Sequence, residues 1–317
     1  MRRERRVIIS ASRRTDVPAF YSEWFMNRIR AGYCVVPNPM YPQQKTKPIS
    51  LKPEDVEIIV FWTRDPAPLI KYLPELDERG YTYYFQYTLL GYPRVIDPRC
   101  PEIEKAIETF SRLSDLIGKE KVLWRYDPIL FSNLTPLEWH KDQIGAIAEK
   151  LKGKTAQLVI SLIDPYRKTK IRLERETGDT FSLDGDAFEP GTYTGLAEWL
   201  GPAMKKIGLR VNTCAERIDL SLYGIEHGKC IDDELIRRII KSRENDLFGA
   251  SAAQVTHRKD PAQREHCGCI ESRDIGMNNT CMFGCKYCYA TGSEKMALRN
   301  YEKHDKKAEA IIDLKMG

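Results

Sequence analysis

Short runs of β-branched and aromatic residues alternate along this chain with stretches of helical periodicity, and this alternation favours repeated βα units. A fold built from such units is an α/β fold with a parallel sheet and helices on its faces. An additional run, Cys34 to Val36, fits either a short strand or a loop. The predicted strands are Val7 to Ala11, Val56 to Trp62, Tyr81 to Leu89, Val122 to Tyr126, Ala156 to Ile163, Gly208 to Thr213, and Asp274 to Met277.

Helix signals fall between these strands. Thr135-Pro136-Leu137-Glu138 offers an N-cap, a proline at the first helical position and a capping-box glutamate, and the pattern stops at Gly153. The other predicted helices run from Asp65-Pro66 to near Gly80, from Pro101 to Ile117, from Tyr193 to Ile207, and from Ser293 to Leu314.

The chain shows no Gly/Ser-rich linker and no break in composition. We therefore expect one domain over residues 1–317, a partial or closed (β/α) barrel of about six to eight parallel strands. The segments Asn38 to Pro53 and Asp164 to Pro190 do not fit the alternation. They predict loops over one face, either as a lid or substrate wall or as solvated insertions.

Apolar content of 42% permits a large core, and no stretch approaches the roughly 20 apolar residues that cross a bilayer. No signal-peptide pattern opens the sequence, so we expect a cytoplasmic protein that does not engage a membrane. Lys plus Arg exceeds Asp plus Glu by only 50 to 45, which permits nucleic-acid binding without indicating it. In a reducing compartment the nine cysteines are expected to be metal ligands or buried thiols.

Three cysteines lie at spacings of four and three residues, in the motif formed by Cys281, Cys285 and Cys288. With nine cysteines among 317 residues, a chance triple at this spacing is rare. Three thiolates on one tight loop can each bind one iron of a cubane cluster and leave the fourth iron open. A structural zinc site would instead need four protein ligands.

This CxxxCxxC motif, with the aromatic Tyr287 before its third cysteine and a short strand ahead of it, resembles the cluster loop of the radical S-adenosylmethionine (SAM) superfamily. Most of the chain also resembles a microbial family of unknown function whose C-terminal cysteines are likened to that loop. The resemblance implies a 4Fe-4S cluster, SAM bound at the open iron, and Tyr287 against the adenine. It further implies an electron donor such as flavodoxin or ferredoxin, and it leaves the small-molecule or macromolecular substrate unidentified.

The motif follows the other strands here, whereas the superfamily usually carries it after the first strand. A circular permutation reconciles the two if the strand from Asp274 to Met277 lies beside Val7 to Ala11. The superfamily's Gly-Gly-Glu stretch is replaced by the segment that follows Val7 to Ala11. The resemblance thus points to SAM-binding candidates by position, which are Ser12, Arg13 and Asp16.

Arg125 interrupts an otherwise apolar predicted strand, and a barrel-facing arginine needs an anionic partner. Because arginine binds carboxylates in bidentate fashion, the carboxylate of SAM is one candidate partner.

Four more cysteines, Cys214, Cys230, Cys267 and Cys269, complete a possible ligand set for a second Fe-S cluster or a zinc ion. We expect them at one end of the barrel, with residues 267–290 as the cluster-binding segment. The alternative is that Cys214 and Cys230 are small buried thiols.

The sequence thus predicts an iron-sulfur radical SAM enzyme that cleaves SAM reductively to start chemistry on an unknown substrate. One alternative is a barrel protein with a structural zinc or a non-catalytic Fe-S site that acts in binding or electron transfer. Another is a protein of nucleic-acid repair or modification.

Overall fold

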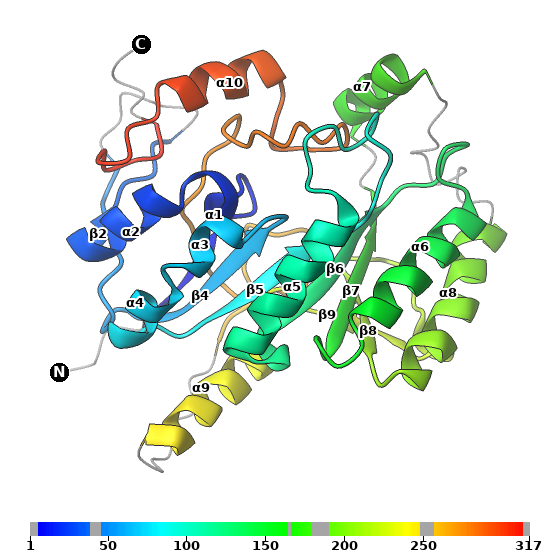
Figure 1. The fold of residues 1–317 in the computed structure, drawn as a ribbon, viewed down its shortest axis with the longest axis horizontal. Helices are drawn as coiled ribbons and strands as arrows, with labels where there is room; N and C mark the ends of the chain where they lie inside the picture. The colour runs from blue at the N-terminus through cyan, green and yellow to red at the C-terminus, as the bar shows by residue number, and fades with distance from the viewer. Residues whose placement is uncertain (1–5, 39–45, 164–165, 179–189, 248–256, 313–317) are drawn as a thin grey trace. The chain divides into compact units, whose positions relative to one another are not determined.

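The computed structural model describes residues 6–38, 46–163, 166–178, 190–247 and 257–312. Within them, eight strands form a mostly parallel sheet in the order β10-β1-β4-β5-β6-β7-β8-β9, flanked by helices (Figure 1). The sheet ends at β10 and β9, so the α/β prediction is confirmed in its partial, unclosed form. The strands are β1 (Val7–Ala11), β4 (Val56–Thr63), β5 (Tyr83–Thr88), β6 (Val122–Ile129), β7 (Gln157–Leu162), β8 (Arg210–Cys214), β9 (Ile225–Gly228) and β10 (Arg273–Asp274), with β2 (Tyr33–Cys34) and β3 (Ile49–Ser50) as a separate antiparallel pair.

Helices follow most of these strands, as the βα pattern predicts. They are α1 (Val17–Phe20), α2 (Ser22–Ala31), α3 (Ala67–Ile70), α4 (Leu73–Glu78), α5 (Ile103–Ile117), α6 (Leu137–Lys150), α7 (Arg167–Thr177), α8 (Pro190–Lys206), α9 (Asp233–Leu247) and α10 (Glu294–Glu302). Two 3-10 turns, Lys119–Lys121 and Ser221–Tyr223, complete the set of helical segments in the described ranges.

Strand β1 has a parallel neighbour on each side. Ile9 pairs with Arg273 and Ser10 with Asp274 on β10, while Ser10 also faces Val60 on β4. The late strand therefore lies beside the first one, and this part of the sequence prediction is confirmed. The polar residues that follow β1 are brought close to those that end β10.

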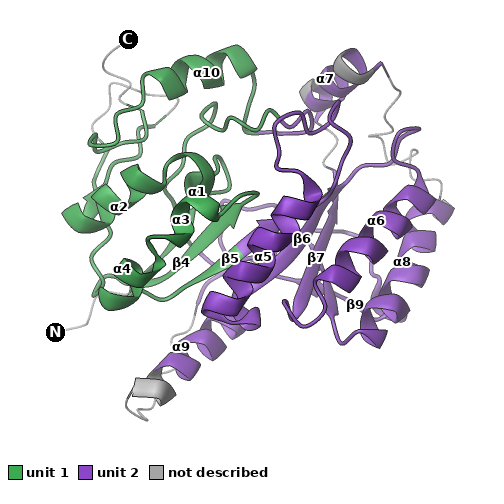
Figure 2. Ribbon diagram, viewed as in Figure 1, with its two compact units in different colours: residues 1–85, 272–284, 290–317 green, residues 86–271, 285–289 purple. Residues whose placement is uncertain are grey.

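The chain divides into two compact units (Figure 2). The first consists of residues 1–85, 272–284 and 290–317, and the second of residues 86–271 and 285–289. Strand β5 passes from one unit to the other. The single domain expected over residues 1–317 stays a prediction.

Each unit has its own aromatic core. In the first, the rings of Phe25 and Phe61 meet edge to face at 5.4 Å, and in the second Tyr87 stacks on Phe110 at 5.1 Å. Strands β4 and β6 are buried along nearly their whole length. A strand covered on both faces has a mostly apolar sequence, which is why β4 and the start of β6 are visible in the sequence.

The predicted helix from Ser293 to Leu314 is wrong in its extent. Ser293 caps α10 by accepting from the Met296 N–H at 3.3 Å, but the helix ends at Glu302. The residues after Glu302 make tertiary contacts instead of continuing the helix. Trp24 Nε1 donates to the Ala308 carbonyl at 3.0 Å, and Ile311 is fully buried. These contacts compete with helix continuation, and residues 313–317 lie outside the described ranges.

Two helix starts also differ from the prediction. Thr135 does not cap α6, because its hydroxyl donates to the Leu130 carbonyl at 2.5 Å and the N-cap position falls on Pro136. The helix expected from Asp65 to near Gly80 is two short helices, α3 and α4.

The sequence prediction missed β9 and only partly described the two long loops. The predicted loop from Asn38 to Pro53 contains β3, and residues 39–45 lie outside the described ranges. The predicted loop from Asp164 to Pro190 contains α7, and residues 164–165 and 179–189 lie outside the described ranges. Because α7 is rich in charged residues, its sequence pattern did not distinguish it from a loop.

His140 on α6 is fully buried in the second unit. Its Nε2 lies 3.0 Å from the Leu130 carbonyl, which can only accept, so Nε2 carries the proton and Nδ1 accepts from the Tyr126 hydroxyl at 2.8 Å. Burial lowers the pKa of His140 to about 4, against the opposing effect of the bond to Leu130. The ring is therefore neutral in the folded protein at neutral pH.

Acidification is expected to destabilise the second unit through His140. Because the unfolded pKa is 6.5 and the folded pKa about 4, unfolded chains bind an extra proton between these values. Neutral His140 contributes about 3 kcal/mol to the free energy of unfolding. This contribution is complete above pH 6.5 and is lost as the pH falls to 4. Urea unfolding of the parent and of His140→Gln at pH 7 and pH 4.5 measures it, and equal losses in both proteins would contradict this assignment.

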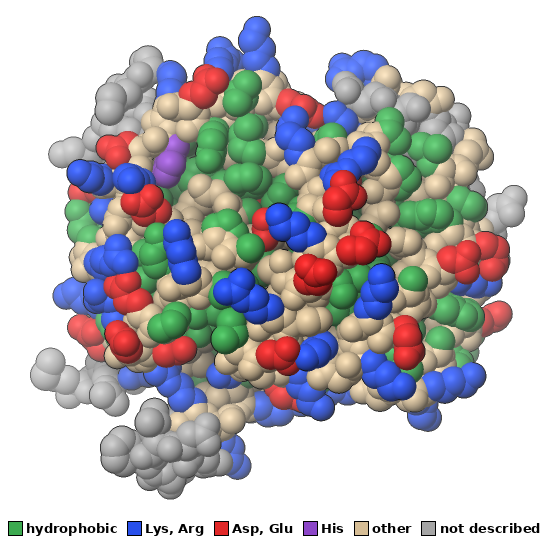
Figure 3. Space-filling model, in the orientation of Figure 1, with side chains coloured by type: hydrophobic (Ala, Val, Ile, Leu, Met, Phe, Trp, Pro, Cys, Tyr) green, Lys and Arg blue, Asp and Glu red, His purple; other side chains and the backbone are tan. Residues whose placement is uncertain are grey.

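Lys and Arg side chains lie among Asp and Glu side chains across the face shown in Figure 3. Among the described residues, no helix combines the length and the apolar character that crossing a membrane requires.

Candidate metal centre

The CxxxCxxC segment is a loop between β10 and α10, and backbone contacts hold its second half. Gly284 has a φ of +72°, a left-handed conformation that favours glycine. The Lys286 N–H donates to the Ile96 carbonyl at 3.0 Å, and the Cys288 N–H donates to the Cys285 carbonyl at 3.1 Å. The second half of the motif is thus tied to the segment between β5 and α5.

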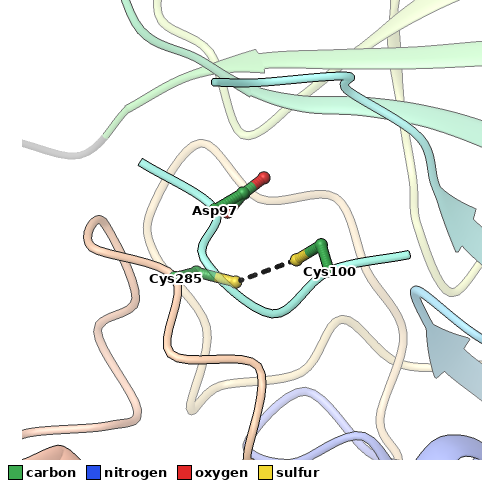
Figure 4. Close-up of side chains that lie close together, drawn as sticks. All are labelled: Asp97, Cys100 and Cys285. Atoms are coloured by element: carbon green, nitrogen blue, oxygen red, sulfur yellow. Dashed lines mark hydrogen bonds between the residues drawn. The ribbon is translucent and has the colours of Figure 1, made fainter. Parts of the chain in front are cut away.

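Cys285 lies beside two potential metal ligands of that segment, Asp97 and Cys100 (Figure 4). The sulfurs of Cys100 and Cys285 are 3.8 Å apart, and the ligand atoms of all three residues lie within 4.8 Å of one another. Asp97 is buried, and both cysteines are half-buried. Within the described ranges, this group can hold a metal ion.

Tyr287, expected beside a bound adenine, also contacts this group. Its hydroxyl donates to Asp97 Oδ2 at 3.1 Å, and its ring meets Tyr92 edge to face at 5.9 Å. Tyr287 therefore links the motif to the same carboxylate that approaches Cys285. Its place against adenine stays a prediction.

Arg172, on α7, holds the motif from another direction. Its Nε donates to the Lys286 carbonyl at 2.6 Å, and its Nη2 donates to the Cys288 carbonyl. Since a guanidinium is planar and carries several donors, it can bind two backbone carbonyls of a loop at once. Arg172 thereby positions the backbone of the last cysteine of the motif.

The geometry at Cys285 fits a thiolate metal site. A zinc-sulfur bond of about 2.3 Å sets the edge of a tetrahedral site at about 3.8 Å, which agrees with the separation of Cys100 and Cys285. Cys281 belongs to the first unit, whereas Cys285 and Cys288 belong to the second. Binding of one cubane by these three thiols stays a prediction.

The other four cysteines gather at the C-terminal ends of β8 and β9, all buried within the second unit. Cys230 hydrogen-bonds to both Cys214 and Cys269, and Cys269 hydrogen-bonds to Cys267. The four thiols thus form a connected line, as the sequence prediction required of a shared site. Metal binding by these four thiols stays a prediction.

Arg125 lies next to this line of thiols. Its Nη1 donates to Cys230 Sγ at 2.8 Å and to Gln86 Oε1 at 3.2 Å, and its Nη2 pairs with Asp127. Burial by itself lowers the pKa of Arg125, but Asp127, Cys230 and Cys214 raise it well above its ordinary value. The anionic partner that Arg125 needs is therefore supplied within the chain, by Asp127.

Ser12 and Arg13 belong to a polar network around Asp274 in the first unit. Asp274 accepts from Ser10 Oγ at 2.8 Å, Ser12 Oγ at 2.6 Å, the Arg13 N–H at 2.8 Å and Arg14 Nε at 3.1 Å. Burial alone would raise the pKa of Asp274, but Arg14 and these donors hold it below its ordinary value. The carboxylate fixes the turn that follows β1.

Asp16 has a structural role of its own. Its carboxylate caps α1 through the Ala19 N–H at 3.0 Å, and it accepts from Thr63 Oγ1 at 2.8 Å and from the Arg64 N–H at 2.6 Å. Burial raises its pKa to about 7 against these hydrogen bonds. The SAM contacts expected of Ser12, Arg13, Asp16 and Arg125 stay predictions.

Sequence reasoning missed Asp97, Cys100 and Arg172. Cys100 and Cys285 are 185 residues apart, so no local spacing connects them. The available signal was that Cys100 is one of two cysteines outside the C-terminal group. This signal did not identify Cys285 as the partner of Cys100.

A protein-family model described as a domain of unknown function (DUF1848) matches residues 8–290. No curated protein and no solved structure matches the chain. The matched range begins within β1 and includes Cys100, the line of four thiols and the whole CxxxCxxC motif.

Proposed function

The chain belongs to the DUF1848 family, and we propose that it is a radical SAM enzyme whose cluster is bound by Cys281, Cys285 and Cys288. The observation that carries the proposal is the CxxxCxxC motif, with Tyr287 inside it, on the loop after β10. The pairing of β10 with β1 supports it, because that pairing is what a permuted order of βα units needs.

A bound 4Fe-4S cluster would supply the electron that cleaves SAM to methionine and a 5'-deoxyadenosyl radical. The three thiolates bind irons, and Arg172 orients the backbone of Lys286 and Cys288. Asp97 fixes the hydroxyl of Tyr287, which leaves the ring as the part available to a nucleoside. The substrate and the electron donor, of the flavodoxin or ferredoxin kind, are not identified by these residues.

A second candidate is a single metal ion at Asp97, Cys100 and Cys285, in a binding or redox protein. The specific observation in its favour is the 3.8 Å separation of the two sulfurs, which agrees with one tetrahedral ion. The two candidates share Cys285, so they cannot both be occupied in one molecule. They differ in whether Cys100 or Cys281 is required.

Metal analysis of anaerobically purified protein tests the proposal. We expect about four irons per chain with broad visible absorption, and formation of 5'-deoxyadenosine when SAM and dithionite are added. Zinc without iron would contradict the cluster and favour the single ion. Iron without 5'-deoxyadenosine would contradict SAM cleavage and leave a redox centre.

A further inference from the structure

The line of four thiols, Cys214, Cys230, Cys269 and Cys267, has no role in the proposed SAM chemistry, yet three separate segments converge to form it. Cys214 ends β8, Cys230 follows β9, and Cys267 and Cys269 come from the segment before β10. All four side chains are buried. Cysteines brought together from distant parts of a chain in this way are typical of a metal site.

Hydrogen bonds to sulfur surround the line. Arg125 Nη1 donates to Cys230 Sγ at 2.8 Å, and the Ile231 N–H points to Cys269 Sγ at 3.4 Å. Gln86 Nε2 donates to the Cys230 carbonyl at 2.7 Å and fixes the backbone there. Donors aimed at sulfur stabilise thiolates and hold metal-ligating side chains in place.

The charges also agree with thiolates. Four thiolates around a divalent ion carry two negative charges, and a buried guanidinium in contact with one sulfur offsets part of them. Arg125 therefore supplies charge complementary to ionised sulfur, the form that metal binding requires.

We propose that Cys214, Cys230, Cys267 and Cys269 bind one structural zinc ion, independent of the CxxxCxxC motif. Each thiol of the line hydrogen-bonds to the next, whereas a cubane would spread its four thiolates over four separate irons. One ion bound by all four thiols would join the ends of β8 and β9 to the segment before β10.

Metal content of the purified protein tests this proposal. We expect one zinc per chain in the parent, in Cys285→Ala and in Cys34→Ser, a buried cysteine that belongs to neither site. Cys214→Ser and Cys269→Ser should each lose it. Parent protein without zinc, zinc retained in both variants, or a loss of about four irons with zinc unchanged would each overturn the proposal.

Alkylation of the parent gives a second readout that needs no variant to fold. We expect zinc to protect these four thiols from iodoacetamide and a chelator to expose them, with Cys34 unchanged by either. Equal labelling with and without chelator would contradict zinc binding. Arg125→Gln should weaken zinc affinity by about 10- to 100-fold, in a competition with a chromogenic chelator, because it removes the donor to Cys230.

Discussion

Changing Cys285 to Ala is expected to remove the iron from this protein and to abolish formation of 5'-deoxyadenosine from SAM. Cys285 is the middle cysteine of the motif, and its sulfur also approaches Cys100 and Asp97. Losing one of three thiolates leaves two irons of the cluster open to solvent, and iron content should fall from about four per chain to near zero. Iron analysis, visible absorption and product chromatography measure the change.

Cys34→Ala provides the matched control, since Cys34 is buried in the first unit and belongs to neither cysteine group. It should retain iron and activity. Unchanged 5'-deoxyadenosine production by Cys285→Ala would refute the catalytic assignment, whatever the iron content.

The second large effect is expected from a pair of variants, Cys281→Ala and Cys100→Ala. If the motif binds a cubane, Cys281→Ala loses iron and SAM cleavage, while Cys100→Ala keeps about four irons per chain. If a single ion binds at Asp97, Cys100 and Cys285, the pattern reverses, because Cys281 is not among those ligands. We expect the first pattern.

Metal content and 5'-deoxyadenosine formation of the two variants, purified side by side without oxygen, decide between them. Loss of metal in Cys100→Ala with full retention in Cys281→Ala would remove the radical SAM proposal. Because both residues are half-buried cysteines, the packing cost of each change is similar. The comparison therefore reports ligand identity.

Strand prediction from the sequence succeeded where burial is continuous. β1, β4 and β7 lie within a residue of their expected ends, because strands covered on both faces are apolar along their length. β9 was missed, since its sequence Ile-Glu-His-Gly has one large apolar residue and lies at a sheet edge. The tail helix was predicted too long because packing of residues 303–312 overrides their helical pattern.

The positions of Cys214 and Cys230 follow from parallel strands, whose carboxyl ends share one edge of the sheet, whereas Cys267 and Cys269 reach them from the segment before β10. Metal binding by these cysteines stays a prediction. Cys100 approaches Cys285 through the loop between β5 and α5, and no periodicity in the sequence encodes that loop's path. For Arg125, the sequence predicted that an anionic partner is needed. It did not predict that Asp127 is that partner.

The pairing of β10 with β1 also sets the order of events during synthesis. Residues 272–284 leave the ribosome long after β1, so the nascent chain exposes one edge of β1 while β4 already covers the other. Open strand edges recruit other chains, and a nascent protein at this stage is a natural client for chaperones. The three cysteines of the CxxxCxxC motif follow directly after β10, so a product truncated before β10 would lack both the strand that covers this edge and the proposed cluster ligands.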